Sequence, residues 1–182
     1  MAEYRIWSML VETMPGFFVG ADLYLPPASV QGPYPGVLSP HGHWKQGRRT
    51  HEDDYSVPSL GINFAVQGYA VLAWDMVGYG DTKQVPHDFV SRERQLWGFT
   101  PLGLQLFNAV RMVDYLVSLP QINASRIGIT GASGGGTQTF LLAAVDPRIR
   151  ISAPVNMVSS HMQGGDPCEE APSLRIGTHN TE

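Results

Sequence analysis

The sequence predicts an α/β fold, with a mostly parallel sheet, helices on both faces and an antiparallel hairpin at the N-terminal end. Two observations carry this prediction. Short apolar segments alternate along the chain with longer segments of helical spacing. Such alternation calls for right-handed crossover connections, which cover a parallel sheet on both sides. In addition, a turn signal near the N-terminus separates two extended segments, a pattern typical of a hairpin.

The first half of the chain contains the hairpin, one helix and two further strands. Residues 5–11 and 17–25 are extended, β-rich segments on either side of the turn signal Met14-Pro15-Gly16. Residues 59–67 place apolar side chains at helical spacing, and Gly68 suits the C-terminal cap of this helix. The two other strands are predicted at residues 35–39 and 69–74.

The second half of the chain repeats the strand and helix alternation. Residues 102–119 carry apolar side chains close to the 3.6-residue period, and Pro120 ends this helix because proline cannot continue it. A second helix is predicted at residues 135–145. The strands of this half are expected at residues 126–130 and 149–155.

Bulk composition limits the classes of partner. The 182 residues, 43% of them hydrophobic, fit one domain, residues 1–182, with a substantial core. The formal charge is -4 and there is no run of Lys or Arg, which disfavours nucleic acid and an anionic membrane surface and favours a small, roughly neutral partner. The single Cys168 excludes an internal disulfide and most zinc sites.

Targeting signals are not evident in the chain. No apolar stretch approaches the roughly 20 residues of a membrane span. The N-terminal segment MAEYRIWSMLVE does not have the basic and then apolar pattern of a secretion signal. We therefore expect a soluble, cytoplasmic protein that does not insert into a membrane, although a chain with its leader removed would give the same expectation.

The most informative motif is GASGG at residues 131–135, which fits G-x-S-x-G and lies directly between a predicted strand and a predicted helix. This is the context of a nucleophile elbow. A serine on so tight a turn adopts a strained backbone, and Gly131 and Gly135 leave space beside it. The helix N-terminus favours negative charge that develops there. We expect Ser133 to be a nucleophile, because the alternative, a phosphate-binding loop, requires spacings that are absent here.

A serine esterase also needs hydrogen-bond donors for the oxyanion. The backbone N–H of Gly134, directly after the nucleophile, is the first expected donor, and that of His43, in the loop after the third strand, is the second. For the imidazoles of His41 and His43, we favour the interpretation that one of them holds this loop by packing and hydrogen bonding. A metal site built with His51 is the weaker alternative, so no metal is predicted.

Further candidates for the site follow the strands predicted at residues 35–39 and 69–74. His41, Trp44 and Tyr79 are predicted to line the substrate pocket, although loop aromatics serve equally often as packing caps. Asp75 begins a glycine-containing exit loop and is expected to accept hydrogen bonds from its backbone amides, which is a structural role.

Three segments together resemble the α/β-hydrolase superfamily, and within it the bacterial acetyl xylan esterase-like and dienelactone hydrolase-like branch. The segments are SPHGHW at 39–44, AWDMVGYGDT at 73–82 and RIGITGASGGGTQT at 126–139. The resemblance implies hydrolysis of a small ester through an acyl-serine, with no cofactor. It makes Ser133 the nucleophile and places the oxyanion between the amides of Gly134 and His43. A dienelactone-type cysteine nucleophile does not fit, because the elbow residue is serine.

The sequence departs from this family after the last predicted strand. In α/β-hydrolases the acid and the histidine of the triad follow the nucleophile, each after a later strand. Here residues 159–182 are polar, rich in Gly and Pro, and contain no further predicted strand. We therefore expect a C-terminally shortened hydrolase domain that lacks the last strands.

The sequence therefore leaves the identity of the general base open. His161, shortly after the last strand, is the first candidate, followed by His179 and His87, although each is more often a surface or loop histidine. Asp166, Glu169 and Glu170 are candidate acids, with a solvated acidic loop as the more common interpretation.

Two expectations follow for the whole chain. If the sheet ends at residues 149–155, an apolar strand becomes an edge that invites a second chain, so we expect a homo-oligomer. The function predicted is an active serine esterase for small or acetylated esters. The alternative is a catalytically impaired hydrolase-fold module with a binding or assembly role.

Overall fold

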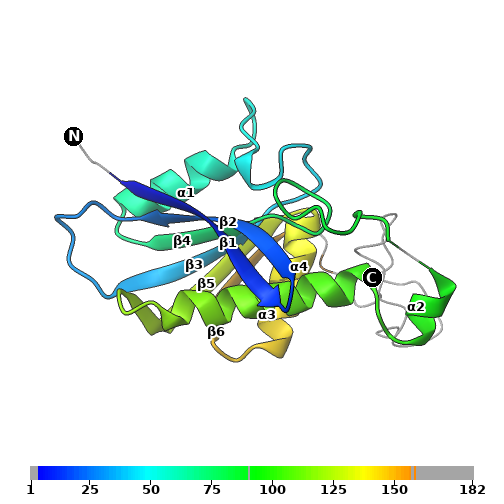
Figure 1. Ribbon diagram of the computed structural model, residues 1–182. Coiled ribbons are helices and arrows are strands. Elements are labelled where there is room, and N and C mark those ends of the chain that lie inside the picture. Colours follow the sequence, from blue (N-terminus) through cyan, green and yellow to red (C-terminus); the bar gives the residue numbers. More distant parts are fainter. Residues whose placement is uncertain (1–3, 90, 157, 159–182) are drawn as a thin grey trace.

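The structure, a computed structural model, describes residues 4–89, 91–156 and 158 (Figure 1). Its centre is a six-stranded sheet with the strand order β1-β2-β4-β3-β5-β6. The strands are β1 (Arg5–Met14), β2 (Phe17–Leu25), β3 (Tyr34–Pro40), β4 (Ala70–Trp74), β5 (Ile122–Ala132) and β6 (Ile149–Val155). The helices are α1 (Val57–Val66), α2 (Arg92–Leu96), α3 (Pro101–Ser118) and α4 (Gly134–Val145), with a short 3₁₀ turn, η1 (Gly47–Arg49).

The pairing of the strands confirms the predicted mixture of directions. β1 and β2 form an antiparallel hairpin, and Gly16 takes a positive φ of 77° in its turn. β2 then pairs antiparallel with β4. The pairs β3 with β4, β3 with β5, and β5 with β6 are parallel. The carboxyl ends of β3, β4, β5 and β6 therefore meet at one edge of the sheet, where ligands bind in folds of this kind.

Two of the three predicted helices, α1 and α3, begin at a side-chain cap. Ser56 accepts a hydrogen bond from the Ser59 amide at the start of α1, and Thr100 accepts one from the Gly103 amide at the start of α3. A proline follows each cap within the first turn, where its missing N–H costs nothing. These caps explain why α1 begins two residues before the segment expected from hydrophobic spacing.

The helices cover both faces of the sheet (Figure 1). α1 lies against one face and contacts β2 and β4, whereas α3 packs on the other face and also contacts α4. The larger apolar core lies between the sheet and α3, whose buried side chains there are Ala109, Met112, Val113 and Leu116. Among the described residues, none of the helices combines the length and apolar composition needed to cross a bilayer.

The segment before the nucleophile motif differs from the expectation. β5 begins at Ile122, because residues 122 and 123 already pair with Tyr34 and Pro35 before the register shifts. Asn123 accepts hydrogen bonds from both the amide and the hydroxyl of Ser125. These bonds close a local turn, which forms an irregularity within the strand.

Candidate active site

Ser133 lies on the turn that joins β5 to α4, at the carboxyl edge of the sheet. Its backbone has φ 56° and ψ -126°, a conformation that costs free energy in a residue with a Cβ atom. The Ser133 amide donates to the carbonyl of Val155, and its carbonyl accepts from the Thr137 amide, each at 3.0 Å. The strand and the helix thus hold a strained serine at the N-terminus of α4.

The glycines beside Ser133 are required by a neighbouring strand. A Cβ atom on Gly131 would lie 2.5 Å from the carbonyl oxygen of Pro40, at the end of β3. A Cβ atom on Gly135 would overlap the same oxygen and lie 2.9 Å from the carbonyl carbon of His41. The backbone at the end of β3 and just after it therefore supplies much of the obstruction that requires glycine at these two positions.

Gly135→Ala is therefore expected to push the loop after β3 away from the turn. The added methyl group meets backbone atoms, which cannot rotate aside, so we expect a loss of about 1–3 kcal/mol in the free energy of unfolding. Gly128→Ala in β5 is the matched control, because its Cβ would meet nothing closer than 3.4 Å. Urea denaturation of the two variants makes the comparison. Equal stabilities would contradict the tight approach.

His43 and Gly134 lie in direct contact. A Cβ atom on Gly134 would be 2.5 Å from Cε1 and 2.9 Å from Nδ1 of the half-buried His43 ring. The first hydrogen bond of α4 runs from the Thr137 amide to the Ser133 carbonyl. The Gly134 amide lies before that point and is not used in the hydrogen bonds within the helix. The structure thus brings together the two residues whose amides are expected to receive the oxyanion.

His41 holds two loops together from inside the protein. Its Nδ1 lies 2.5 Å from the carbonyl oxygen of Gly42, and its Nε2 accepts from the Met76 amide at 2.9 Å. Since a carbonyl only accepts, Nδ1 carries the hydrogen and the ring is neutral. Complete burial lowers the pKa of His41 to about 4. With no exposed surface, its imidazole has the loop-holding role and not the pocket-lining one that was also expected.

The two aromatic candidates lie in different surroundings. Trp44 stacks on Tyr55 with ring centroids 3.9 Å apart, and its indole lies against Gly42. Tyr79 packs edge-on against His41 at 5.4 Å and against His43 at 6.2 Å. Tyr79 therefore adjoins the residues around Ser133, whereas Trp44 joins the loop after β3 to the loop before α1.

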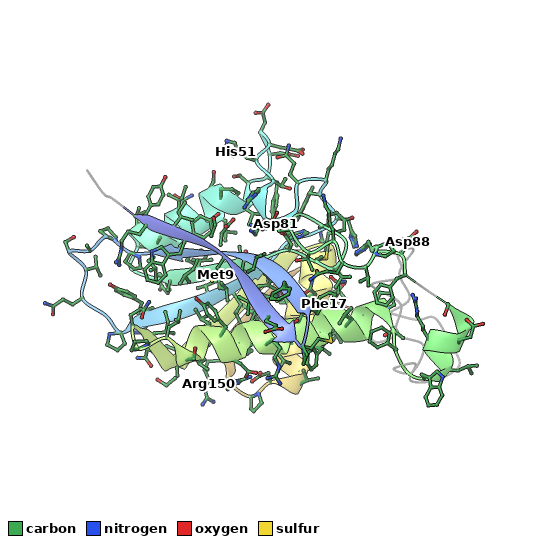
Figure 2. All side chains as sticks on the ribbon, viewed as in Figure 1. Met9, Phe17, His51, Asp81, Asp88 and Arg150 are labelled. Carbon is green, nitrogen blue, oxygen red and sulfur yellow. The ribbon has the colours of Figure 1, made fainter. Side chains whose placement is uncertain are left out.

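Beneath these loops lies a buried charge cluster that the sequence did not reveal. Arg48 is 1% exposed and its guanidinium contacts three carboxylates, Asp22 at 2.9 Å, Asp81 at 2.7 Å and Asp75. Asp81 is labelled in Figure 2. The Asp75 carboxylate also accepts from the amides of Arg48 and Asp81, which confirms its expected role toward the loop backbone. Burial raises the pKa of Asp75, and the neighbouring Arg48 opposes that rise.

Two of the remaining histidine candidates, His51 and His87, lie within the described residues. His51 bonds to Ser56 at 2.7 Å on a loop that projects from the fold (Figure 2), and His87 lies 3.1 Å from His43 between their Nε2 atoms. Within the described part of the chain, no cluster of three or more His, Cys, Asp or Glu side chains could hold a metal. The other predicted candidates, His161, His179, Asp166, Glu169, Glu170 and Cys168, lie outside the described residues.

Comparison with known proteins matches this chain to one family model, to related sequences and to solved structures. The family model for acetyl xylan esterase (AXE1) matches residues 3–163. YtaP of Bacillus subtilis (strain 168), whose name assigns it to the hydrolases, is 32% identical over 155 residues, which cover 82% of this chain. The solved structure of methylesterase BT1017 superposes with a TM-score of 0.71 at 30% identity over 91% of this chain. Acetyl xylan esterase from Paenibacillus sp. R4 gives 0.62 at 20% identity over 84%.

The chain spans only part of the length of these proteins. The matched region is 52% of YtaP, 35% of methylesterase BT1017 and 53% of the Paenibacillus enzyme. The 20% identical structure supports the fold alone. Taken with the strand order and the covering helices, the matches confirm the predicted α/β-hydrolase-type fold.

Proposed function

Because this chain belongs to the acetyl xylan esterase (AXE1) family, we propose that it hydrolyses small or acetylated carboxylic esters through Ser133. The observation that carries the proposal is the backbone of Ser133, a residue with a Cβ atom at φ 56° between a strand and a helix N-terminus. Such strain is retained where the position of a side chain matters for chemistry. The names of similar proteins, a methylesterase and an acetyl xylan esterase, agree with an ester that has a small alcohol or acyl group.

The proposed reaction has two halves. In the first, Ser133 Oγ attacks the ester carbonyl, its proton passes to a base, and the carbonyl oxygen becomes an oxyanion that accepts from the amides of Gly134 and His43. The C–O bond to the alcohol then breaks, the base returns the proton to the departing alkoxide, and an acyl-Ser133 remains. In the second half, water gives a proton to the same base and its oxygen attacks the acyl carbon. The bond from that carbon to Ser133 Oγ then breaks, the base returns the proton to Oγ, and the acid is released. The scheme uses no cofactor.

His161 is proposed as this base, on the ground of its place in the sequence after β6. The serine hydroxyl is a weak nucleophile without a partner that takes its proton. His41 is unsuited to the role, because both of its ring nitrogens are already hydrogen-bonded inside the protein.

Covalent labelling tests the proposal directly. An organophosphonate ester that phosphonylates activated serines is expected to add once to the 182-residue chain, on the peptide that contains Ser133. Mass spectrometry after proteolysis locates the adduct. Prior incubation with p-nitrophenyl acetate is expected to slow the labelling, because both compounds compete for the same hydroxyl. A labelled serine elsewhere, or labelling at the rate of free serine, would refute the nucleophile.

We also propose that the 182-residue chain forms a homo-oligomer through β6. Within the described residues, β6 pairs on one side only and ends the sheet, and Ile151 and Val155 are 72% and 48% exposed. A groove of about 360 Å³, lined mainly by apolar residues that include Phe64, Ile127 and Ile151, adjoins this edge. Arg150 marks the strand in Figure 2. An unpaired apolar edge of this kind stabilises contact with a second copy.

Sedimentation velocity at micromolar concentration is expected to show a dimer or larger species. Ile151→Lys should shift the population toward monomer, because it places a charge in the apolar edge. Ser118→Lys, on the exposed C-terminal end of α3, should leave the distribution unchanged. A monomeric wild-type chain would overturn the proposal.

A further inference from the structure

Two imidazoles form a hydrogen-bonded pair beside Ser133. The Nε2 atoms of His43 and His87 lie 3.1 Å apart, with ring centroids at 5.0 Å. His43 belongs to the loop after β3, and His87 lies 44 residues later in the long loop after β4. The ring of His43 lies against Gly134, so His87 is connected through one imidazole to the residue that follows Ser133.

The hydrogen bonds around His87 fix the place of its proton. Its Nδ1 lies 2.7 Å from the carbonyl oxygen of Val77, which can only accept, so Nδ1 carries the hydrogen. In the neutral ring Nε2 is then an acceptor. The hydrogen between the two rings must therefore be on Nε2 of His43.

The surroundings hold His87 in this orientation. A Cβ atom on Gly78 would overlap the His87 amide nitrogen and lie 2.7 Å from its Cα, so the two backbones are in close contact. The Tyr79 ring packs on His87 at 4.9 Å and on His43 at 6.2 Å. Among the described residues, Tyr79 faces the pair, the neutral His41 lies behind it, and Asp88 follows His87 in the chain.

We propose that His87 is a positioning residue of the esterase site, which holds the His43 imidazole against Gly134 and thereby aligns the two proposed oxyanion donors. The inference rests on the proposed function of Ser133. His87 fixes His43, His43 packs on Gly134, and the amides of His43 and Gly134 face the developing charge.

The expected kinetic signature follows from when the donors act. Oxyanion donors bind the charge that develops in the transition state, so their misalignment lowers kcat and leaves KM nearly unchanged. Deletion of one such donor costs about 10²–10³ in kcat, and a displaced donor should cost less, about 10-fold or more.

Two substitutions separate the hydrogen bonds of His87. His87→Asn places an amide N–H near Nδ1, where it can donate to Val77, but has no acceptor for His43. His87→Gln reaches the position of Nε2 with an amide oxygen that can accept from His43. His51→Gln, in the projecting loop, is the matched control and should behave like wild type.

The kinetics of p-nitrophenyl acetate hydrolysis decide between positioning and simple packing. We expect His87→Asn to lower kcat about 10-fold at constant KM, and His87→Gln to retain a rate within about 3-fold of wild type. Equal losses in both variants would indicate packing alone and overturn the inference, as would wild-type behaviour of both.

A second measurement does not depend on activity. In the Ser133→Ala protein at neutral pH, imidazole ¹⁵N–¹H correlation spectra should show His87 protonated on Nδ1 and a hydrogen on Nε2 of His43. A proton on Nε2 of His87 would overturn the inference even if the esterase is active. The expected proton positions together with no Ser133-dependent hydrolysis would refute the proposed function while the imidazole pair stands, and the positioning role would fall with that function.

Discussion

Ser133→Ala is expected to lower kcat/KM for p-nitrophenyl acetate by about 10³-fold or more, to the level that binding and the oxyanion amides can sustain alone. The substitution removes the only atom that forms a bond to the substrate in the proposed mechanism. It leaves the turn in place, since the Ser133 amide and carbonyl bond to Val155 and Thr137 through the backbone. Initial rates over a range of substrate concentrations provide the measurement.

The matched control is Ser118→Ala, which removes an exposed hydroxyl bonded to the carbonyl of Tyr115 at the end of α3. It should retain the wild-type rate. Thermal unfolding of both variants shows whether a loss of rate reflects chemistry or folding, because each change on its own alters few contacts. Similar rates for wild type and Ser133→Ala would remove the serine esterase from consideration and leave the family fold without the proposed chemistry.

The largest expected effect on stability is that of Arg48→Met, which should lower the free energy of unfolding by about 3–5 kcal/mol. The methionine fills most of the space of the arginine stem but leaves Asp22 and Asp75 buried without their counter-charge. Breaking a buried pair by removing one partner is costly, because the remaining charge stays out of water. Urea denaturation at neutral pH, followed by tryptophan fluorescence, measures the change.

Arg49→Met provides the comparison at the next position. The Arg49 side chain is 56% exposed and lies 3.3 Å from Asp81 and 3.8 Å from Asp22, two of the same carboxylates. Exposed ion pairs contribute at most about 1 kcal/mol, so Arg49→Met should have a small effect. If the two variants lost equal stability, burial would not be what makes Arg48 important.

Much of the fold could be predicted from local pattern. The helices at 101–118 and 134–145 and the hairpin around Gly16 follow from spacing, caps and turn residues that act over a few positions. The turn at Ser133 could be found for the same reason, because its glycines and its place between a strand and a helix are contiguous in the chain.

The contacts that organise the site could not be found in this way. Arg48 lies in a polar loop and pairs with Asp22, 26 residues earlier, and with Asp75, 27 residues later. His87 meets His43 across 44 residues. Local sequence patterns indicate periodicity and turns. These pairs depend instead on which loops converge at the sheet edge. The one signal available was the rule that ligands bind beyond the carboxyl ends of parallel strands, which points to the loops after β3 and β4.

Attempts to redirect this scaffold to other esters should treat His41 as part of the framework. Nδ1 of its neutral ring donates to the loop after β3, and Nε2 accepts from the loop after β4. No other neutral side chain places one donor and one acceptor on opposite sides of a rigid ring in this way. Substitution at Trp44 or Tyr79 leaves these two bonds in place, whereas substitution at position 41 removes the link between the two loops. A randomised library should therefore leave position 41 unchanged.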